Sequence, residues 1–339
     1  MFIQDLRPTG PRRRITLGAM SAAVAGIFTL AGCGGGSPSS SEPGSAAAGA
    51  GKLDKVTVGV LPITDVAPMY LGERQGFFED EGIELELQPA QGGAAIVPAV
   101  TTGEYQFGYS NAVSLLIAQD ESLPIKVISN GSSSTNEPGH DTTEVAAMPD
   151  SGISGPADLA GRTVAVNALN NFADITIRNS VEQAGGDPRQ VKFVEIPYPN
   201  MPAALARGDV DAAWTTEPFR TQILDAGGKI VASPMTDMAE NFDSAFYFTS
   251  QQTLDRNPEL VERFRTALHK SFEYASENED QVRTIIQDYA KVTPELAEKV
   301  EMTAWRPEIN LDGLKALGTA AKKYGVLENE PDYNALIVQ

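Results

Sequence analysis

Cysteine and histidine are almost absent from this chain, which has one Cys and two His among 339 residues. So few of them exclude a disulfide framework and leave too few ligands for a Cys/His zinc site. Basic residues are also scarce, since 26 Lys and Arg stand against 45 Asp and Glu and give a formal net charge of -19. Phosphate backbones repel such a polyanion, so we expect no nucleic-acid partner. The chain is long enough for about two globular domains.

The single cysteine falls at the end of a short apolar segment. Arg12–Arg14 precede an uncharged stretch over Ile15–Gly32, which ends in Leu30–Gly32 directly before Cys33. A basic region, an apolar region and small residues before a cut site are typical of an export signal. The stretch is short and rich in small residues compared with the ~20 residues of a membrane-spanning helix. The sequence Leu-Ala-Gly-Cys resembles the lipobox of bacterial lipoproteins, which implies a signal peptide over 1–32 and a lipid on Cys33.

The segment that follows, residues 33–52, consists mainly of Gly, Ser, Ala and Pro. Such a composition buries too little apolar surface to offset the entropy of ordering it, so we expect a flexible tether. No later segment is long and apolar enough to span a bilayer. We therefore expect an exported protein that its lipid anchors to the outer face of the cell membrane or in the periplasm. The three arginines leave the choice between the Sec and twin-arginine routes open.

The rest of the chain contains two successive units in which strands and helices alternate. Strands are expected at Lys55–Val60, Ile83–Gln88 and Tyr105–Tyr109, and again at Thr163–Val166, Val191–Ile196 and Val210–Trp214. In both units a helix ends at a glycine, Gly103 or Gly208, just before the third strand. Alternation of this kind predicts an α/β fold with a parallel-rich mixed sheet in each of two lobes and helices on both faces.

The repeat also predicts how the chain divides between the lobes. We expect lobe 1 to consist of 53–142 plus 244–339, and lobe 2 of 143–243. The chain then crosses between the lobes near Asn130–Thr143 and near Asp243–Thr249. The long amphipathic helix expected from Pro258 to about Glu277 packs back on lobe 1 in this interpretation.

Several motifs in this order resemble a known family. They are Val58-Gly59-Val60, Pro68-Met69-Tyr70-Leu71-Gly72, Gln75-Gly76-Phe77-Phe78, Gly155-Pro156-Ala157-Asp158-Leu159 and Gly208-Asp209-Val210-Asp211-Ala212 before Glu217-Pro218. Together they are similar to the type 2 solute-binding proteins of the sulfonate/nitrate/taurine group, the NMT1/THI5-like and SsuA-like proteins. The resemblance implies a venus-flytrap receptor, of the type 2 periplasmic-binding-protein fold, that passes a small solute to an ABC importer. The permease and its ATPase are then other chains, because this one has no phosphate-cradling Walker loop.

Polar side chains follow the strands at the turns where parallel sheets bind ligands. Ligands of open parallel sheets lie beyond the carboxyl ends of the strands, where helices begin and present free N–H groups. The expected ligand-binding residues are Thr64, Asp65, Met69, Gln91, Ser110, Asn111, Asn130, Asn167, Asn170, Phe172, Trp214 and Glu217. Several of them are equally good helix caps, and Phe172 is also a natural core residue, so both interpretations stay open for each.

The acidic candidates make a prediction about the solute. If Asp65 and Glu217 both face the cleft, a cationic or neutral heterocycle such as a thiamine precursor, a pyrimidine or a flavin is favoured over a sulfonate or nitrate. Two unit charges at 4 Å interact by about 4 kcal/mol at an effective dielectric constant near 20. Arg178 or free helix N–H groups are the alternative, and they favour an anion.

We expect a monomeric binding protein with no catalytic residue, cofactor or metal. Gly108-Tyr109-Ser110-Asn111-Ala112 only faintly resembles a nucleophile elbow, because Ala112 replaces the second glycine. Two alternatives stay open. One is a THI5-like enzyme that synthesises a pyrimidine, and the other is a surface lipoprotein with no role in transport.

Overall fold

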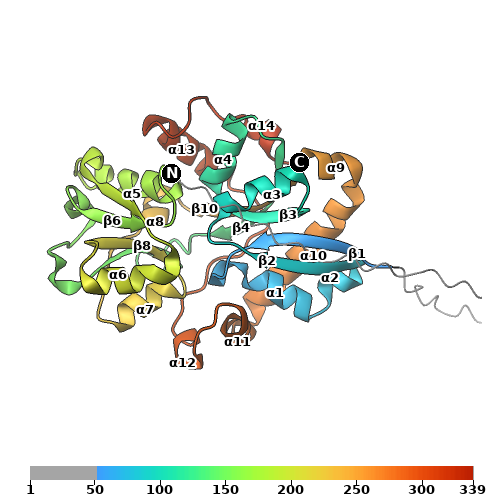
Figure 1. The fold of residues 1–339 in the computed structure, drawn as a ribbon, viewed down its shortest axis with the longest axis horizontal. Helices are drawn as coiled ribbons and strands as arrows, with labels where there is room; N and C mark the ends of the chain where they lie inside the picture. The colour runs from blue at the N-terminus through green and yellow to red at the C-terminus, as the bar shows by residue number, and fades with distance from the viewer. Residues whose placement is uncertain (1–51, 339) are drawn as a thin grey trace, which may run out of the picture. The chain divides into compact units, whose positions relative to one another are not determined.

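A computed structural model describes residues 52–338 of the chain (Figure 1). The expected signal peptide, Cys33 and nearly all of the expected tether lie outside the described residues. No helix within 52–338 is long and apolar enough to cross a membrane.

The first sheet has five strands in the order β2-β1-β3-β10-β4. The strands are β1 (Asp54–Val60), β2 (Ile83–Pro89), β3 (Phe107–Asn111), β4 (Ile125–Ser133) and β10 (Asp243–Ser250). β1, β2 and β3 are parallel, and β10 is antiparallel to both β3 and β4. The helices between these strands are α1 (Ala67–Arg74), α2 (Phe77–Asp80), α3 (Val97–Thr102) and α4 (Ala112–Asp120).

The second sheet repeats this plan in the order β7-β6-β8-β5-β9. Its strands are β5 (Thr143–Ala147), β6 (Thr163–Val166), β7 (Lys192–Glu195), β8 (Ala212–Thr216) and β9 (Lys229–Ala232). Its helices are α5 (Phe172–Gln183), α6 (Met201–Arg207), α7 (Phe219–Asp225) and α8 (Pro234–Met238). Figure 1 shows α5 and α8 on one side of this sheet and α6 and α7 on the other. The prediction of two α/β lobes with mixed sheets is thus confirmed.

The two glycines that matched in sequence occupy equivalent places. Gly103 ends α3 with φ 80°, and Gly208 ends α6 with φ 74°. This left-handed conformation is strained for residues with a Cβ. In each lobe it turns the backbone from the helix into the next strand, β3 or β8. The internal repeat seen in the sequence therefore has a structural basis.

The chain passes between the sheets at residues 134–142, from β4 to β5, and again at residues 233–242, from β9 to β10. The expected second crossing at Asp243–Thr249 is wrong, because those residues form β10 inside the first sheet. The apolar run Ala245–Phe248 indicates a strand in the sequence, but the place of that strand in a sheet depends on distant partners. The lobe boundaries at 142/143 and 243/244 stay a prediction.

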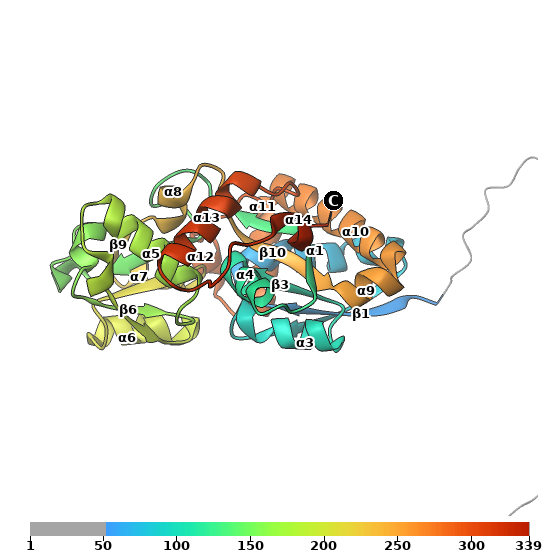
Figure 2. The same ribbon diagram turned by 90° about the horizontal axis from the view of Figure 1, so that it is seen from above.

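The C-terminal helices contact elements of both lobes. They are α9 (Gln251–Arg256), α10 (Pro258–Glu277), α11 (Glu279–Tyr289), α12 (Pro294–Ala297), α13 (Leu311–Lys323) and α14 (Tyr333–Leu336). α10 packs on α1 and α2, as its apolar face predicts, and Asn257 caps it by accepting a hydrogen bond from the backbone N–H of Leu260. α13 instead contacts α4 of one lobe and α5 of the other, and Figure 2 shows it extending over both. The sequence predicts this block on lobe 1; α10 packs there, whereas α13 contacts both lobes.

Candidate functional site

A small cavity lies where the carboxyl ends of the strands in the two sheets face each other. It holds about 40 Å³ of free space, enough for little more than water-sized atoms. Its wall consists of Leu61, Ile63, Asp65, Gly93, Tyr109, Asn111, Ser244 and Ala245 from the first lobe and Thr143, Asn167, Phe172, Tyr198, Trp214 and Thr216 from the second. No Arg, Lys or His is among these residues of the described chain.

The lobes touch directly around this cavity. The backbone N–H of Thr64 donates to the carbonyl of Glu217 at 3.3 Å, and the side-chain amide of Asn171 donates to the Ser114 hydroxyl at 3.1 Å. Each bond joins the start of a helix or turn in one lobe to its counterpart in the other. The described structure is therefore a closed form.

Asp65 is the one charged residue among the described residues that line the cavity. It follows β1 in a 3-10 turn over Thr64–Val66, and only 4% of it is exposed. The hydroxyl of Tyr109 donates to Oδ2 at 3.4 Å, and the indole N–H of Trp305 donates to the Asp65 carbonyl at 2.8 Å. The other carboxylate oxygen, Oδ1, is buried and has no partner among the described residues.

Burial controls the protonation of Asp65. Loss of water around the carboxylate raises its pKa to about 6, although the neighbouring hydroxyls of Ser132, Thr142 and Tyr109 oppose the rise. The group is therefore mostly ionised at neutral pH. An ionised carboxylate with an unused oxygen in a buried cavity is a strong acceptor for an ammonium or N–H group.

Aromatic rings of the second lobe form the opposite wall. The ring centroids of Phe172 and Trp214 lie 5.9 Å apart, and those of Tyr198 and Trp214 lie 6.0 Å apart. Phe172 begins α5, whereas Trp214 lies in β8. Rings at this spacing support one another and offer a rigid apolar surface, and their faces also attract cations.

The second lobe also contributes unused hydrogen-bonding groups. The indole Nε1 of Trp214 and the hydroxyl of Thr216 are buried without a partner in the described part of the chain. An unpaired buried polar group costs about 1–3 kcal/mol, so such groups usually have a ligand or water as partner. Across the cavity, an unused acceptor on Asp65 thus stands opposite unused donors on β8.

Five of the twelve residues expected to bind the ligand line this cavity. They are Asp65, Asn111, Asn167, Phe172 and Trp214. Asn111 also caps α4, where its side chain accepts from the Ser114 N–H at 2.9 Å. The capping and ligand-facing interpretations are therefore compatible at this position.

Glu217 is not where the charge argument placed it. Its carboxylate accepts from the Arg220 guanidinium at 3.0 Å and from the Thr221 hydroxyl at 2.8 Å. Burial raises its pKa, and Arg220 opposes the rise. The carboxylate belongs to this internal cluster and not to the cavity wall, because a partner three residues later satisfies it. Of the two acids, only Asp65 lies in the cavity wall, so the condition that both face the cleft is not met.

The other six expected residues lie outside the cavity wall. Thr64 contacts Glu217 through its backbone, and Met69 is fully buried in the core. Local structure explains the remaining positions. Gln91 is exposed, and Ser110 lies against Gly93. The side chain of Asn130 is hydrogen-bonded to Ser133 and Asp243, and the backbone N–H of Asn170 donates to Asp174.

Arg178, the alternative partner for an anion, lies in a separate surface hollow. It donates to the carbonyl of Pro188 and lies 4.9 Å from the centre of the Phe193 ring. It therefore offers nothing to a solute in the cavity. Within residues 52–338, no cluster of three His, Cys, Asp or Glu side chains has the geometry to hold a metal ion.

Sequence reasoning missed several residues of the wall, including Tyr109, Tyr198, Ser244 and Gly93. Gly93 had a readable signal, because glycine pairs before a helix permit close approach. A Cβ at this position would lie 2.7 Å from the Cα of Ser110. Tyr198 and Ser244 gave no such signal, since only the folded sheets bring them to the cavity.

Comparisons with solved structures establish which fold this chain has. The fold matches the alkanesulfonate-binding protein SsuA of Xanthomonas axonopodis pv. citri, solved bound to MOPS, with a TM-score of 0.71 and 14% identity over 84% of this chain and 98% of that one. The periplasmic nitrate-binding protein NrtA of Synechocystis PCC 6803 gives a TM-score of 0.70 and 13% identity over 84% of each chain. The chain therefore has the periplasmic-binding-protein fold.

The family follows from the sequence match. Residues 63–282, well over half of the chain, match the family described as NMT1/THI5 like, and the chain belongs to that family. It is 28% identical to the taurine-binding periplasmic protein of Escherichia coli over 177 residues, 52% of each protein. It is 25% identical to a 4-amino-5-hydroxymethyl-2-methylpyrimidine phosphate synthase of Aspergillus parasiticus over 223 residues, 61% of this chain and 62% of that one. The matches span only about half to three fifths of these curated relatives.

Proposed function

We propose that this protein is the extracytoplasmic receptor of an ABC importer, which captures a small solute between its lobes and delivers it to a permease. The family, the two-lobed fold and a cavity enclosed by both lobes support this function. The relatives named for taurine, sulfonates and nitrate indicate the same role. The permease and its ATPase are separate proteins in this proposal.

The Asp65 carboxylate indicates the chemistry of the solute. It is buried, has one unused oxygen, and shares the wall with no cationic side chain of the described residues. A solute with an ammonium or N–H group therefore gains a charge-assisted hydrogen bond, whereas a simple anion meets like charge. We propose that the solute carries an amine, and that nitrate and sulfonates without an amine are excluded.

The second lobe supports a further feature of the solute. The unused N–H of Trp214 and the hydroxyl of Thr216 offer donors to an oxygen or ring nitrogen at the other end of the molecule. Both an aminosulfonate and an aminopyrimidine have this polarity. The small cavity favours a compact solute over a flavin, and the lobes must separate slightly from the closed form to admit one.

A thermal-shift screen tests the proposed solute class. The exported chain, carrying Cys33→Ser to leave it free of lipid, is mixed with paired compounds: taurine with ethanesulfonate, and 4-aminopyrimidine with pyrimidine, each beside nitrate. We expect the amine-bearing member of at least one pair to stabilise the protein, by about 2.7 kcal/mol at a hundredfold excess over its dissociation constant. Equal stabilisation by ethanesulfonate or nitrate contradicts the proposal.

The synthase relative favours an enzyme as the second candidate. The two functions differ in what happens to the bound solute. A receptor releases the compound unchanged, so mass spectrometry after prolonged incubation recovers all of it. Conversion of the compound identifies an enzyme.

We also propose that a lipid on Cys33 holds the receptor at the membrane. Cys33 is the only cysteine in the chain. We expect the wild-type protein to sediment with membranes in a bacterial expression host, and Cys33→Ser to appear in the soluble extracytoplasmic fraction. Membrane association of both forms rules out this anchor.

A further inference from the structure

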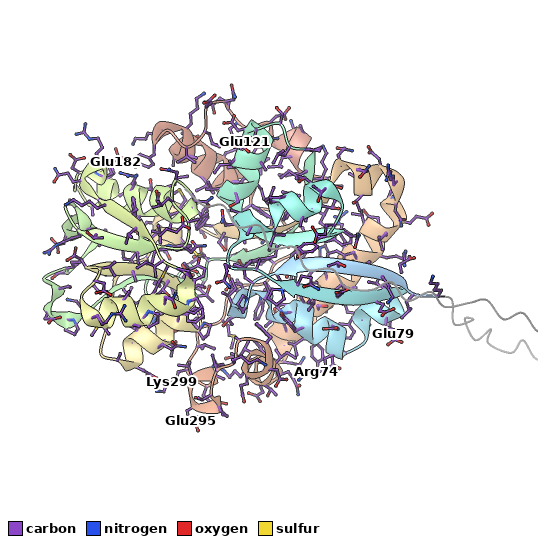
Figure 3. The ribbon with its side chains drawn as sticks, viewed as in Figure 1. Arg74, Glu79, Glu121, Glu182, Glu295 and Lys299 are labelled. Carbon is purple, nitrogen blue, oxygen red and sulfur yellow. The ribbon has the colours of Figure 1, made fainter. Side chains whose placement is uncertain are left out.

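A third segment of chain, residues 299–307, runs beside the two crossings between the lobes. On the lobe 2 side, the ammonium of Lys299 lies 2.8 Å from the Asp225 carboxylate of α7. The backbone N–H of Glu301 donates to the Glu217 carboxylate at 3.2 Å. Figure 3 shows Lys299 at the edge of lobe 2, next to Glu295 of α12. The beginning of this segment is thus attached to lobe 2.

The end of the same segment is attached to lobe 1. Ala304 and Ser133, at the end of β4, exchange both backbone hydrogen bonds, at 3.0 and 3.2 Å. The Thr303 hydroxyl donates to the Ser133 carbonyl at 2.9 Å. Trp305 reaches the ligand site itself, because its indole N–H bonds the Asp65 carbonyl. Residues 299–307 therefore link lobe 2 to the end of β4 and to the turn that contains Asp65.

A buried charge cluster fastens this segment to lobe 2. The Arg220 guanidinium lies 3.0 Å from the Glu217 carboxylate and 3.8 Å from that of Glu301, and it donates to the carbonyl of Gly139 in the first crossing. The side chain of Arg220 is only 4% exposed and that of Glu217 is fully buried. Charges removed from water in this way depend on their partners, so the cluster resists separation.

The same cluster positions the rim of the cavity. The backbone carbonyl of Glu217 accepts the N–H of Thr64, the residue before Asp65, across the cleft. The Glu217 carboxylate holds the loop that presents this carbonyl. Glu217 thus acts on the site through the backbone, although its side chain faces away from the cavity.

We infer that residues 299–307 form a third connection between the lobes, and that Glu217 and Arg220 fasten it in the closed form and so set the equilibrium between open and closed receptor. This inference rests on closure of the two lobes and not on the identity of the solute. Glu217 is a positioning residue in this account. Loss of the cluster removes contacts made in the closed form and favours the open one.

Distance measurements between the lobes test the inference without any solute. The Cys33→Ser chain has no other cysteine, so Glu104→Cys in lobe 1 and Lys192→Cys in lobe 2, both exposed, accept a pair of spin labels. The test variant combines Glu217→Gln with Arg220→Met, because removing one partner alone leaves the other charge buried and unpaired. We expect a larger open fraction in the free protein and about a 3- to 10-fold weaker solute affinity. The saturated protein is expected to regain the parent distance.

A milder variant keeps the inference testable if the double variant fails to fold. Lys299→Ala breaks an exposed ion pair and is expected to shift closure in the same direction by about 2-fold. Lys315→Ala removes the same charge from the Lys315–Asp312 pair within α13 and serves as the matched control. The inference is overturned if the distances and the affinity equal those of the parent in the folded Glu217→Gln/Arg220→Met variant. The same result in Lys299→Ala also overturns it. The distances in the free protein can shift even if none of the tested solutes binds. That result counts against the proposed solute and not against the third connection.

Discussion

Asp65→Asn is expected to weaken binding of the amine-bearing solute by about 100- to 1,000-fold. The substitution keeps the size of the side chain and removes the only charge in the wall of the cavity among the described residues. Removing one partner of a buried, hydrogen-bonded charge pair costs about 2–5 kcal/mol, because the other charge is left without a counterpart. The ammonium of the solute takes that place here.

Isothermal titration of the parent and Asp65→Asn chains measures this effect. The matched control is Asp80→Asn, which makes the same chemical change in the exposed pair with Lys270 and leaves affinity unchanged. A compound without an amine is expected to bind Asp65→Asn at least as well as the parent. An unchanged dissociation constant in Asp65→Asn removes this carboxylate from the site.

Glu144→Gln is expected to stabilise the protein at alkaline pH by about 2–4 kcal/mol. Glu144 lies in β5 and is fully buried. Its Oε1 accepts from the backbone N–H groups of Gly139 and Asp141 at 3.0 and 3.2 Å, and its Oε2 has no partner among the described residues. Burial, and then the nearby Asp141 carboxylate, raise the pKa of Glu144 from 4.5 to about 8.

The direction of the effect follows from this raised pKa. The folded state holds the proton of Glu144 up to about pH 8, whereas the unfolded chain releases it near pH 4.5. The contribution to stability is complete below pH 4.5 and is lost as pH rises to about 8. Glutamine has no proton to lose, and its carbonyl can still accept the two backbone N–H groups.

Urea denaturation at pH 5 and pH 9 measures the difference. We expect the gain in unfolding free energy of Glu144→Gln over the parent to be larger at pH 9 than at pH 5. Glu121→Gln changes an exposed carboxyl and is expected to have no such pH dependence. An equal effect of Glu144→Gln at both values contradicts a raised pKa.

The sequence predicted the parts of the site that depend on local order along the chain. Asp65, Asn111 and Phe172 stand where strands end and helices begin, and this position can be inferred from periodicity and capping residues. The helix expected from Pro258 ends at Glu277, as its apolar face predicts. Features set by residues within a few positions of one another were therefore readable.

Features set by distant residues were not. Strands β4, β5 and β9 were not predicted, and β5 and β9 are short and gain their place only from sheet partners. Glu217 was interpreted as a ligand because it follows a strand, although Arg220, three residues later in the first turn of α7, was a candidate partner. Tyr198 and Ser244 reach the cavity only through the tertiary fold.

The pH dependence of solute affinity tests the central claim most directly, since it reports the charge of the carboxylate that faces the solute. With the pKa of Asp65 at about 6, the dissociation constant of an alkylamine solute such as taurine is expected to be nearly constant between pH 7 and pH 8. Below pH 6 it is expected to rise by about tenfold per pH unit, because protonation removes the counter-charge of the ammonium. A dissociation constant that does not change between pH 5 and pH 8, or one that falls as the pH is lowered, contradicts an amine held by Asp65.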